Sequence, residues 1–325
     1  MVSDQATGED AGTAVAEPGR RWLTGIVPPV CTPFGEDGDV DAASLERHIS
    51  FLLEAGVHGL FVLGSSGEVA FLTDAQRDRV LEVAVKTNGG QVPVLAGAID
   101  MTTSRVIDHA LRAKQRGVDA IVLTVPFYAR TTHPAEVKLH FQTVRDRVGL
   151  PLVAYDIPVA VHSKLDVALS LELAGEGVID AIKDSSNDLT GFRGLVTGTR
   201  HFETFSVFTG SELVVDCALY FGAEGAVPGL ANVDPHGFVA LYESCRSGDW
   251  AKAREIQERL VGLFDITNCA NPLKKGPSSS GLGGFKTALM LRGVIAHNAM
   301  GLPQIPLDAE EVAAVRAVLV REALL

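Results

Sequence analysis

Cysteine, positive charge and long apolar runs are all scarce in this chain of 325 residues. The four cysteines lie far apart and form no Cys-x-x-Cys pair; they are Cys31, Cys217, Cys245 and Cys269. The sequence therefore predicts neither a disulfide framework nor a thiolate zinc site, and a reducing compartment fits this pattern. Because no run is apolar for long enough to span a bilayer, we expect a cytoplasmic protein with no membrane partner.

The shortage of positive charge limits the classes of partner. The formal net charge is -12 at pH 7, whereas binding to nucleic acid or to an anionic membrane requires basic patches. The nine histidines show no metal-ligand spacing. We therefore expect a small-molecule substrate, no metal and no nucleic-acid partner.

The chain divides into a short polar tail and one long unit. Residues 1–21 are rich in Ala, Gly, Asp and Glu and lack the basic start and apolar run of a signal peptide, so we predict a disordered tail. Residues 22–325 contain no repeat beyond a strand–helix alternation. We predict that they form a single domain, which includes a C-terminal helical extension at about 249–325.

Eight short apolar runs alternate with segments of helical periodicity. Each run is apolar on both faces, as in the buried strands of a parallel sheet. The runs cover residues 25–30, 57–63, 92–98, 120–125, 152–157, 178–182, 203–208 and 225–227. We predict an α/β fold, the (β/α)8 TIM barrel. An open doubly wound sheet is the alternative, although no Gly-x-Gly-x-x-Gly turn follows the first run.

The helical segments precede and follow the eighth run. Those before it cover residues 44–55, 73–84, 102–116, 134–147, 166–176 and 211–221, and Thr73 is a candidate N-cap. Those after it cover residues 235–246, 249–268, 284–298 and 308–322. We predict a loop at 271–284, where Gly, Pro and Ser crowd together.

One apolar run ends in a lysine. Residues 178–182 lead directly into Lys183, which is followed by Asp184 and Ser185. An amine held away from water binds its proton less tightly and becomes a nucleophile toward carbonyl groups. The simpler alternative is a lysine that ends the strand and reaches water or a carboxylate.

A tyrosine, Tyr155, interrupts the preceding apolar run. Its phenol needs a polar partner inside the barrel, and Lys183 at the end of the next strand is the natural neighbour. In barrels of this type the reactive groups lie where the strands end. We therefore expect both side chains to point into one cavity.

The second run ends in a turn of small residues, Gly64–Glu68, with the sequence Gly-Ser-Ser-Gly-Glu. Its backbone N–H groups and hydroxyls can bind a carboxylate or a phosphate, and the alternative is a tight turn in which a serine caps a helix. Because the loops after the seventh and eighth runs carry no basic residue, phosphate is disfavoured. Tyr128 follows the fourth run at the barrel rim, where packing is the alternative to catalysis.

Five short sequence motifs occur together and in order along the chain. They are Val27-Pro-Pro-Val-Cys-Thr-Pro-Phe34, Gly64-Ser-Ser-Gly-Glu68, Pro126-Phe-Tyr128, Tyr155-Asp-Ile-Pro158 and Ile182-Lys-Asp-Ser185. With them the chain, from Gly25 to its C-terminus, resembles the dihydrodipicolinate synthase / N-acetylneuraminate lyase superfamily of Schiff-base pyruvate enzymes. The resemblance implies a (β/α)8 barrel with appended C-terminal helices, usually a homotetramer, and a covalent imine with pyruvate in place of any metal or other cofactor.

The resemblance also implies roles for single residues. Lys183 matches the Schiff-base lysine, and Tyr155 matches the tyrosine that carries protons to and from the imine. Ser65 and Ser66 match the Ser/Thr pair that holds the pyruvate carboxylate and links the tyrosine to a proton relay. Tyr128 matches the relay tyrosine, which in many members acts across a subunit interface.

Other positions depart from particular branches of the family. Dihydrodipicolinate synthases carry an arginine after the strand-five tyrosine that grips aspartate semialdehyde, and this chain has Ala160 there. Asp74 and Phe127 stand where the family's lysine inhibitor site has other residues, so we expect no feedback by lysine. Sialic-acid lyases carry an Asp-Glu pair after strand seven, and Glu212 supplies at most one of the two.

We therefore predict a class I pyruvate aldolase, a carbon–carbon lyase that reversibly cleaves a 2-keto-3-deoxy sugar acid or a 4-hydroxy-2-oxo acid to pyruvate and an aldehyde. The alternatives are a 4-hydroxy-tetrahydrodipicolinate synthase, a dehydratase that uses the same imine, and a non-catalytic barrel that binds a keto acid. The predicted catalytic residues are Lys183, Tyr155, Tyr128 and Ser65. The predicted substrate-binding residues are Gly64, Ser65, Ser66, Ala160, Ser185, Glu212 and Val227.

Overall fold

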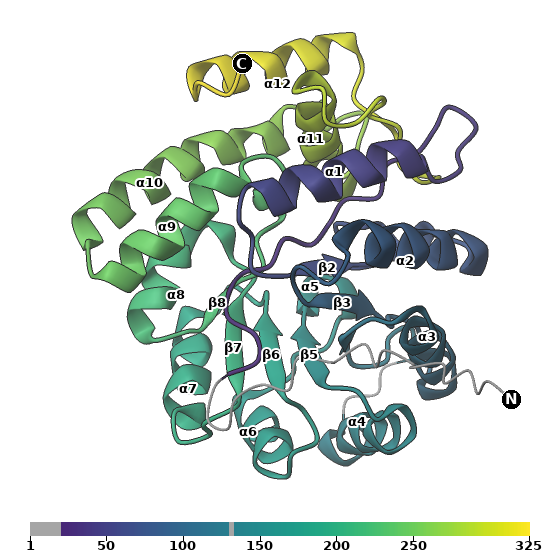
Figure 1. The fold of residues 1–325 in the computed structure, drawn as a ribbon, viewed down its shortest axis with the longest axis vertical. Coiled ribbons are helices and arrows are strands. Elements are labelled where there is room, and N and C mark those ends of the chain that lie inside the picture. Colours follow the sequence, from purple (N-terminus) through teal and green to yellow (C-terminus); the bar gives the residue numbers. More distant parts are fainter. Residues whose placement is uncertain (1–20, 130–132) are drawn as a thin grey trace, which may run out of the picture.

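Eight parallel strands follow one another along the chain, and helices separate them (Figure 1). The computed structural model describes residues 21–129 and 133–325, so the predicted tail lies outside the described residues except for Arg21. Every strand residue is buried, which explains why each run is apolar on both faces. The strands are β1 (Gly25–Ile26), β2 (Leu60–Val62), β3 (Val94–Gly97), β4 (Ala120–Leu123), β5 (Leu152–Asp156), β6 (Ala181–Asp184), β7 (Ser206–Thr209) and β8 (Gly225–Ala226).

The sheet closes on itself. Neighbouring strands pair in parallel from β2 to β8, and β8 pairs with β1. The last seam is closed just beyond β1, where the Phe61 N–H donates to the Pro28 carbonyl at 3.0 Å and the Val30 N–H donates to the Phe61 carbonyl at 2.9 Å. The predicted (β/α)8 barrel is confirmed, and the open doubly wound alternative is wrong.

Helices cover the outside of the sheet, as Figure 1 shows. The helices that lie between the strands in the sequence are α1 (Ala42–Glu54), α2 (Asp74–Asn88), α3 (Thr103–Arg116), α4 (Pro134–Val148), α5 (Pro158–Val161), α6 (Val167–Gly175), α7 (Leu189–Thr199) and α8 (Val215–Phe221). The C-terminal helices are α9 (Pro235–Ser247), α10 (Trp250–Leu263), α11 (Pro277–Leu291) and α12 (Ala309–Arg321). Short 3-10 turns are η1 (Val69–Phe71), η2 (Glu212–Val214), η3 (Gly229–Asn232) and η4 (Phe264–Asn268).

The C-terminal helices are built onto the β1–β8 side of the barrel. Phe238 of α9, Leu260 of α10 and Phe285 of α11 share one buried apolar cluster with Ile26 of β1 and Leu230 after β8. Burial of these large side chains supplies most of the driving force for docking the extension. The C-terminal helices therefore pack against the first and last strands of the barrel through shared apolar side chains.

Helix ends follow signals in the sequence. Thr73 caps α2 and forms a capping box with Gln76, as predicted for its N-terminus. Gly117 ends α3 with φ +87°, and Gly149 ends α4 with φ +67°. These left-handed conformations favour glycine, so the chain leaves each helix at a defined residue and turns back into the sheet.

Helix α7 was not predicted. Its glycines, Gly191, Gly194 and Gly198, lower intrinsic helix propensity and obscure the apolar periodicity. The helix forms nevertheless because the Asp188 side chain accepts N–H groups of its first turn and because Phe192 is buried against the barrel.

Helix α11 also differs from the prediction. It begins at Pro277, inside the loop predicted for residues 271–284, and it ends at Leu291. Proline fits the first turn of a helix, where its missing N–H costs nothing. The glycines have a packing role, because a Cβ at Gly284 would lie 2.3 Å from the Ile266 carbonyl oxygen. The small residues of this run thus let α11 pack closely against the backbone at Ile266.

We expect Gly284→Ala to destabilise the protein by about 1–3 kcal/mol, because the added methyl group would overlap the Ile266 carbonyl. Gly281→Ala, in the same helix, meets open space and should stabilise the protein by about 0.5–1 kcal/mol. Urea denaturation of the two variants measures both changes in the free energy of unfolding. Equal stabilisation by both substitutions would contradict the close contact.

Candidate active site

Lys183 and Tyr155 are register partners on the neighbouring strands β6 and β5. Partners in a parallel pair point to the same face of the sheet, so both side chains lie on one side of the barrel wall. The Lys183 Nζ lies 4.2 Å from the centre of the Tyr155 ring and 5.1 Å from the centre of the Phe61 ring. The structure thus places the Lys183 amine beside the Tyr155 ring, as the sequence analysis expected.

The surroundings of Lys183 argue against the simpler explanation of a strand-ending lysine. The residue is only 5% exposed, so its amine does not extend into open water. In the part of the chain that the structure describes, no carboxylate lies within ion-pair distance of its Nζ; the lysine nearest to it in sequence, Lys164, takes the carboxylates at the strand ends instead. The amine therefore stays available to a bound carbonyl group.

Phe61 connects this pair to the turn after β2. Its ring meets the Tyr155 ring edge to face, with centroids 6.2 Å apart and an interplanar angle of 85°. A Cβ at Gly64 would lie 2.7 Å from the Phe61 ring, so glycine lets the turn fold over that ring. The Ser65 hydroxyl and the Tyr155 hydroxyl share a hydrogen bond of 3.4 Å. Gly64, Ser65 and Tyr155 therefore belong to one site.

The turn Gly64–Glu68 leaves backbone donors free. Among the described residues, the N–H groups of Ser65, Ser66 and Gly67 have no hydrogen-bond acceptor. The turn itself is fixed, because the Glu68 N–H donates to the Ser65 carbonyl at 3.0 Å. Several free N–H groups in one turn, together with two hydroxyls, are donors of the kind that can bind an anion.

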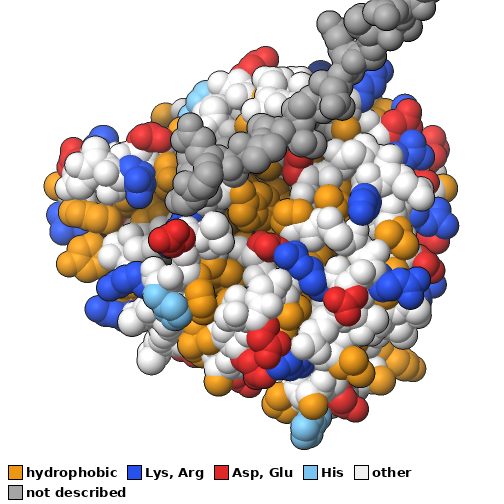
Figure 2. All heavy atoms as spheres, turned by 60° about the horizontal axis from the view of Figure 1, so that its bottom comes forward, with side chains coloured by type: hydrophobic (Ala, Val, Ile, Leu, Met, Phe, Trp, Pro, Cys, Tyr) orange, Lys and Arg blue, Asp and Glu red, His pale blue; other side chains and the backbone are white. Residues whose placement is uncertain are grey.

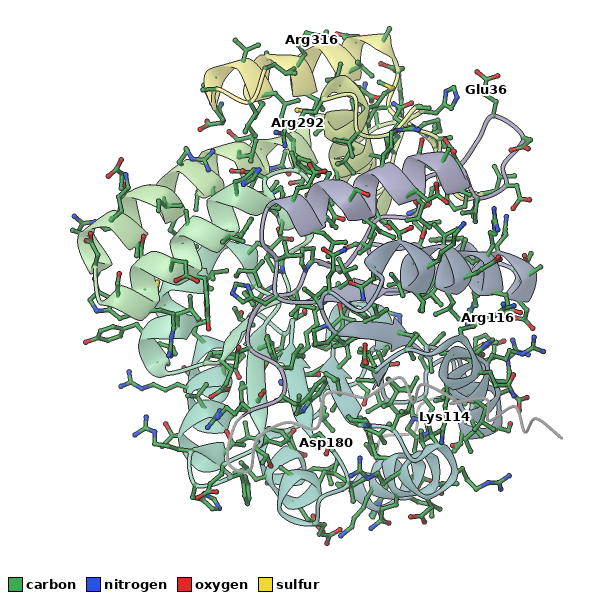
Figure 3. All side chains as sticks on the ribbon, in the orientation of Figure 1. Glu36, Lys114, Arg116, Asp180, Arg292 and Arg316 are labelled. Atoms are coloured by element: carbon green, nitrogen blue, oxygen red, sulfur yellow. The ribbon has the colours of Figure 1, made fainter. Side chains whose placement is uncertain are left out.

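Charged groups fix both ends of the strands that carry the pair. Before β6, Asp180 accepts the first N–H of β5 at 2.8 Å and pairs with Arg145 at 2.6 Å; Figure 3 labels Asp180 near the lower ends of these strands. At the C-terminal ends of the two strands, the Lys164 Nζ pairs with Asp156 and lies 3.8 Å from Asp184. Burial raises the pKa of Asp156, and the hydrogen bond from Lys164 opposes this shift. The sequence analysis missed this cluster.

Two further predicted positions, Ser185 and Val227, lie near the ends of β6, β7 and β8. A Cβ at Gly210 would lie 1.9 Å from the Ser185 Oγ and 3.1 Å from the Lys183 Cε. Glycine at this position therefore lets the Ser185 hydroxyl and the Lys183 side chain pack closely against the backbone. Val227 is buried directly after β8 and donates its N–H to the carbonyl of Thr209 at 2.8 Å, which joins it to the end of β7.

Glu212 stands in η2, after β7, and is partly buried. One of its carboxylate oxygens accepts the Leu230 N–H at 2.5 Å. Burial raises the pKa of Glu212 to about 7, while hydrogen bonds from Leu230 and Gly229 and the charge of Lys183 oppose the shift. The Glu212 carboxyl group therefore titrates near neutral pH and interacts electrostatically with Lys183.

Tyr128 and Ala160 lie at the exposed rim. Tyr128 is 92% exposed and has a left-handed φ of +76°. Within the described residues, none of its contacts reaches Tyr155 or Ser65, whose hydroxyls bond to each other. Ala160 is exposed in the short helix α5. The structure thus brings together most of the predicted site but leaves these two residues at its edge.

The sequence analysis missed Lys286, whose side chain contacts Glu68 at the end of the turn. The Lys286 Nζ lies 2.5 Å from a Glu68 carboxylate oxygen, although the two residues are 218 positions apart. Lys286 occurs in a stretch of small residues without a motif, so no local signal could have identified it. The contact ties the C-terminal extension to the turn Gly64–Glu68.

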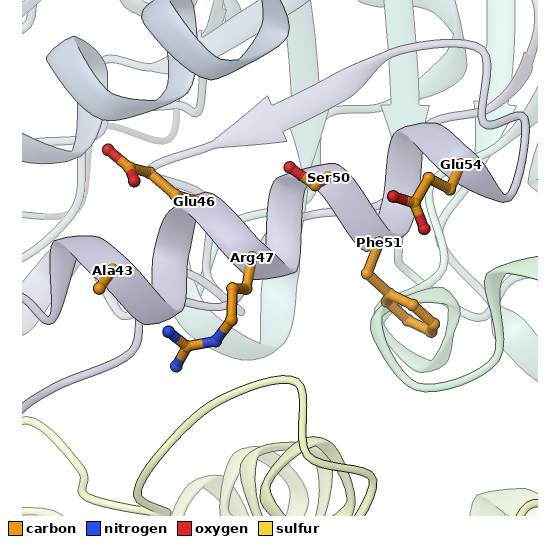
Figure 4. Close-up of a pocket in the computed structure, with 6 residues that line it drawn as sticks. All are labelled: Ala43, Glu46, Arg47, Ser50, Phe51 and Glu54. Carbon is orange, nitrogen blue, oxygen red and sulfur yellow. The ribbon is translucent and has the colours of Figure 1, made fainter.

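Other surface features do not compete with this site. A depression of about 480 Å³ lies on the outer face of α1 (Figure 4), lined by Ala43, Glu46, Arg47, Ser50, Phe51 and Glu54. Figure 2 shows positive and negative side chains interspersed on one face without a continuous basic patch. Across residues 21–129 and 133–325, no group of three or more His, Cys, Asp or Glu could hold a metal ion, and no helix is long and apolar enough to cross a membrane.

The family profile described as "Dihydrodipicolinate synthetase family" matches residues 22–322. A 4-hydroxy-tetrahydrodipicolinate synthase of Staphylococcus carnosus is 33% identical over 272 residues, which cover 83% of this chain and 92% of that protein. An uncharacterized DapA-like lyase of Halobacterium salinarum is 35% identical over 295 residues, which cover 91% of this chain and 92% of that protein.

The solved structures agree with the sequence relatives. YagE, a prophage protein of the dihydrodipicolinic acid synthase family from E. coli K12, has been solved in complex with pyruvate. It superposes with a TM-score of 0.86 at 30% identity, over 93% of this chain and 99% of that one. The resemblance inferred from the motifs is confirmed, and so is the prediction of a lyase. The chain belongs to the dihydrodipicolinate synthetase family of carbon–carbon lyases.

Proposed function

We propose that the protein is a class I aldolase in which Lys183 forms an imine with pyruvate. The observation that carries the proposal is the buried Lys183 amine, which makes no ion pair among the described residues and lies 4.2 Å from the centre of the Tyr155 ring. The amine attacks the ketone, water leaves, and the iminium draws electrons from the adjacent carbon. A carbon–carbon bond can then form or break beside that carbon.

Tyr155 is proposed to move the protons. Its ring lies beside the amine, and its hydroxyl bonds to the Ser65 hydroxyl at 3.4 Å. General acid–base catalysis requires a group within hydrogen-bond reach of the reacting atoms. Tyr155 donates a proton to the oxygen that leaves as water during imine formation, and it accepts the proton of the substrate hydroxyl during retro-aldol cleavage.

The turn Gly64–Glu68 is proposed to hold the pyruvate carboxylate. The free N–H groups of Ser65, Ser66 and Gly67 support this role, because an anion satisfies donors that otherwise have no acceptor in the described chain. The two serine hydroxyls add further donors. The pyruvate in the solved structure of the E. coli relative supports a small keto acid as the ligand.

We propose a cytoplasmic homotetramer in which Tyr128 completes the proton relay of a neighbouring subunit. Tyr128 is 92% exposed at the barrel rim, and its φ of +76° is uncommon for a large side chain. A tyrosine held in this way suits a contact with another subunit better than an open surface. The scattered free cysteines support a reducing compartment.

For the second substrate we propose the aldehyde of a 2-keto-3-deoxy sugar acid or of a 4-hydroxy-2-oxo acid. Ala160 offers no guanidinium group for the carboxylate of aspartate semialdehyde. Ser185 and Glu212 can bond to hydroxyl groups, which such aldehydes carry. The relatives named 4-hydroxy-tetrahydrodipicolinate synthase make that reaction the second candidate.

Borohydride reduction in the presence of pyruvate tests the imine. We expect the intact mass of the wild-type protein to rise by one reduced pyruvate adduct and the adduct to map to Lys183. Lys183→Arg should not be trapped, because a guanidinium group does not form the imine. Lys252→Arg, at an exposed position, is the matched control and should be trapped like the wild type. The absence of an adduct on the wild-type protein would refute the Schiff-base reaction.

A comparison of substrates tests the role of Ala160. We expect faster release of pyruvate from 2-keto-3-deoxy acids than consumption of aspartate semialdehyde with pyruvate, as measured by kcat/KM for each. Ala160→Arg should not improve cleavage of the sugar acids, because their uncharged hydroxylated ends do not need a guanidinium group. Efficient synthase kinetics in the wild-type protein would favour the second candidate instead.

The raised pKa of Glu212 predicts a pH-dependent loss of stability. Between about pH 4.5 and about pH 7 the folded protein keeps a proton on Glu212 that the unfolded chain releases, so its free energy of unfolding falls as the pH rises. Relative to Glu212→Gln, the wild type should lose about 2–4 kcal/mol over this interval. Denaturant titrations of both proteins at pH 5 and pH 8 measure the difference, and parallel pH profiles would show that Glu212 titrates normally.

A further inference from the structure

A buried ion pair joins the C-terminal extension to the anion-binding turn. The side chains of Lys286, in α11, and Glu68, at the end of the turn, are both 0% exposed, and their charged atoms lie 2.5 Å apart. The Lys286 Nζ also lies 4.2 Å from the centre of the Phe34 ring. Burial lowers the pKa of Lys286, and the charge of Glu68 opposes that shift. The amine is therefore surrounded by protein and directed at one partner.

Both oxygens of Glu68 are held by the extension. Glu68 Oε1 contacts the Lys286 Nζ, and Oε2 accepts the Gly301 N–H at 2.8 Å. A Cβ at Gly301 would lie 3.2 Å from the same Oε2 and 3.0 Å from Phe71, which shows how closely this segment approaches the turn. The orientation of Glu68 is thus set almost entirely by residues that come after the barrel in the sequence.

Stability alone does not account for this pair. A buried ion pair seldom stabilises a protein more than well-packed apolar side chains of the same volume, because both charges lose their hydration. The neighbouring buried clusters of this protein are apolar. A pair of charges in such surroundings is better explained by a role in specifying geometry.

The backbone of Glu68 shows what that geometry is. Glu68 has φ +57° and ψ +31°, a left-handed conformation that is uncommon for residues other than glycine. In this conformation the Glu68 N–H donates to the Ser65 carbonyl at 3.0 Å. This hydrogen bond closes the turn that carries the free N–H groups of Ser65, Ser66 and Gly67. An unfavourable backbone conformation persists only when surrounding contacts enforce it. The two bonds to the Glu68 side chain are such contacts.

We propose that Lys286 is a positioning residue for substrate binding, which through Glu68 holds Ser65 and Ser66 in the arrangement that receives the pyruvate carboxylate. This inference rests on the proposed function of the turn. It assigns part of the affinity for pyruvate to the C-terminal extension, which contributes no group to the reacting atoms. Lys183 lies on β6 and does not depend on this contact, so the amine keeps its chemistry when the turn loosens.

The proposal predicts a separation of binding from chemistry. Lys286→Met removes the charge but keeps the length of the side chain, so Glu68 loses its partner and the turn is no longer held. The pyruvate concentration for half-maximal borohydride trapping of Lys183 should rise at least about tenfold, since small misplacements of binding groups have effects of this size. Trapping at saturating pyruvate should still reach completion.

A second buried pair provides the matched control. The Lys275 Nζ lies 2.6 Å from the Glu311 Oε2, and these side chains are 3% and 5% exposed. The pair joins the residues before α11 to α12 and does not contact the turn. Lys275→Met therefore breaks an equivalent buried ion pair of the same extension. It should lower the midpoint of thermal unfolding but change the half-maximal pyruvate concentration by less than about twofold.

The outcomes separate the two hypotheses. Equal shifts in pyruvate dependence for Lys286→Met and Lys275→Met would overturn the positioning role and leave the imine intact. Failure of the wild type to be trapped at all would instead refute the proposed function, and this inference with it. If Lys286→Met does not fold, the double variant Glu68→Gln with Lys286→Met removes both charges together. It must show the same rise in pyruvate concentration, and wild-type affinity in that variant would contradict the proposal.

Discussion

The register between β5 and β6 is the constraint on which the whole site depends. It sets Tyr155 directly opposite Lys183, and a slip by one residue would turn one of the two side chains to the other face of the sheet. Asp180 at one end, and Lys164 between Asp156 and Asp184 at the other, oppose such a slip. These charged groups thereby hold Tyr155 and Lys183 in alignment.

Around this pair the site depends on close packing as much as on functional groups. Glycine at position 64 lets the turn fold over Phe61, and glycine at position 210 lets the Ser185 hydroxyl lie against the backbone next to Lys183. The free N–H groups and serine hydroxyls lie on the turn that Phe61 connects to Tyr155. The C-terminal extension completes the arrangement from outside the barrel, because Lys286 of α11 and the Gly301 backbone hold the Glu68 side chain.

Much of the barrel could be predicted from the sequence, because strands buried on both faces are continuous apolar runs and their order alone implies a parallel sheet. The pairing of Tyr155 with Lys183 followed from that order. The contact between Lys286 and Glu68 could not be predicted, since it spans 218 positions and leaves no periodic signal. The start of α11 was missed because glycines that suggest a loop, such as Gly284, serve a close backbone contact instead.

The central claim is that Lys183 activates pyruvate with Tyr155 as the proton carrier. Exchange of the pyruvate methyl protons with deuterium in D2O, followed by proton NMR, measures this step without a second substrate. The account predicts exchange with the wild-type protein, none with Lys183→Arg, and a decrease of about 10²–10⁴-fold with Tyr155→Phe. Exchange that persists in Lys183→Arg at the wild-type rate would contradict it.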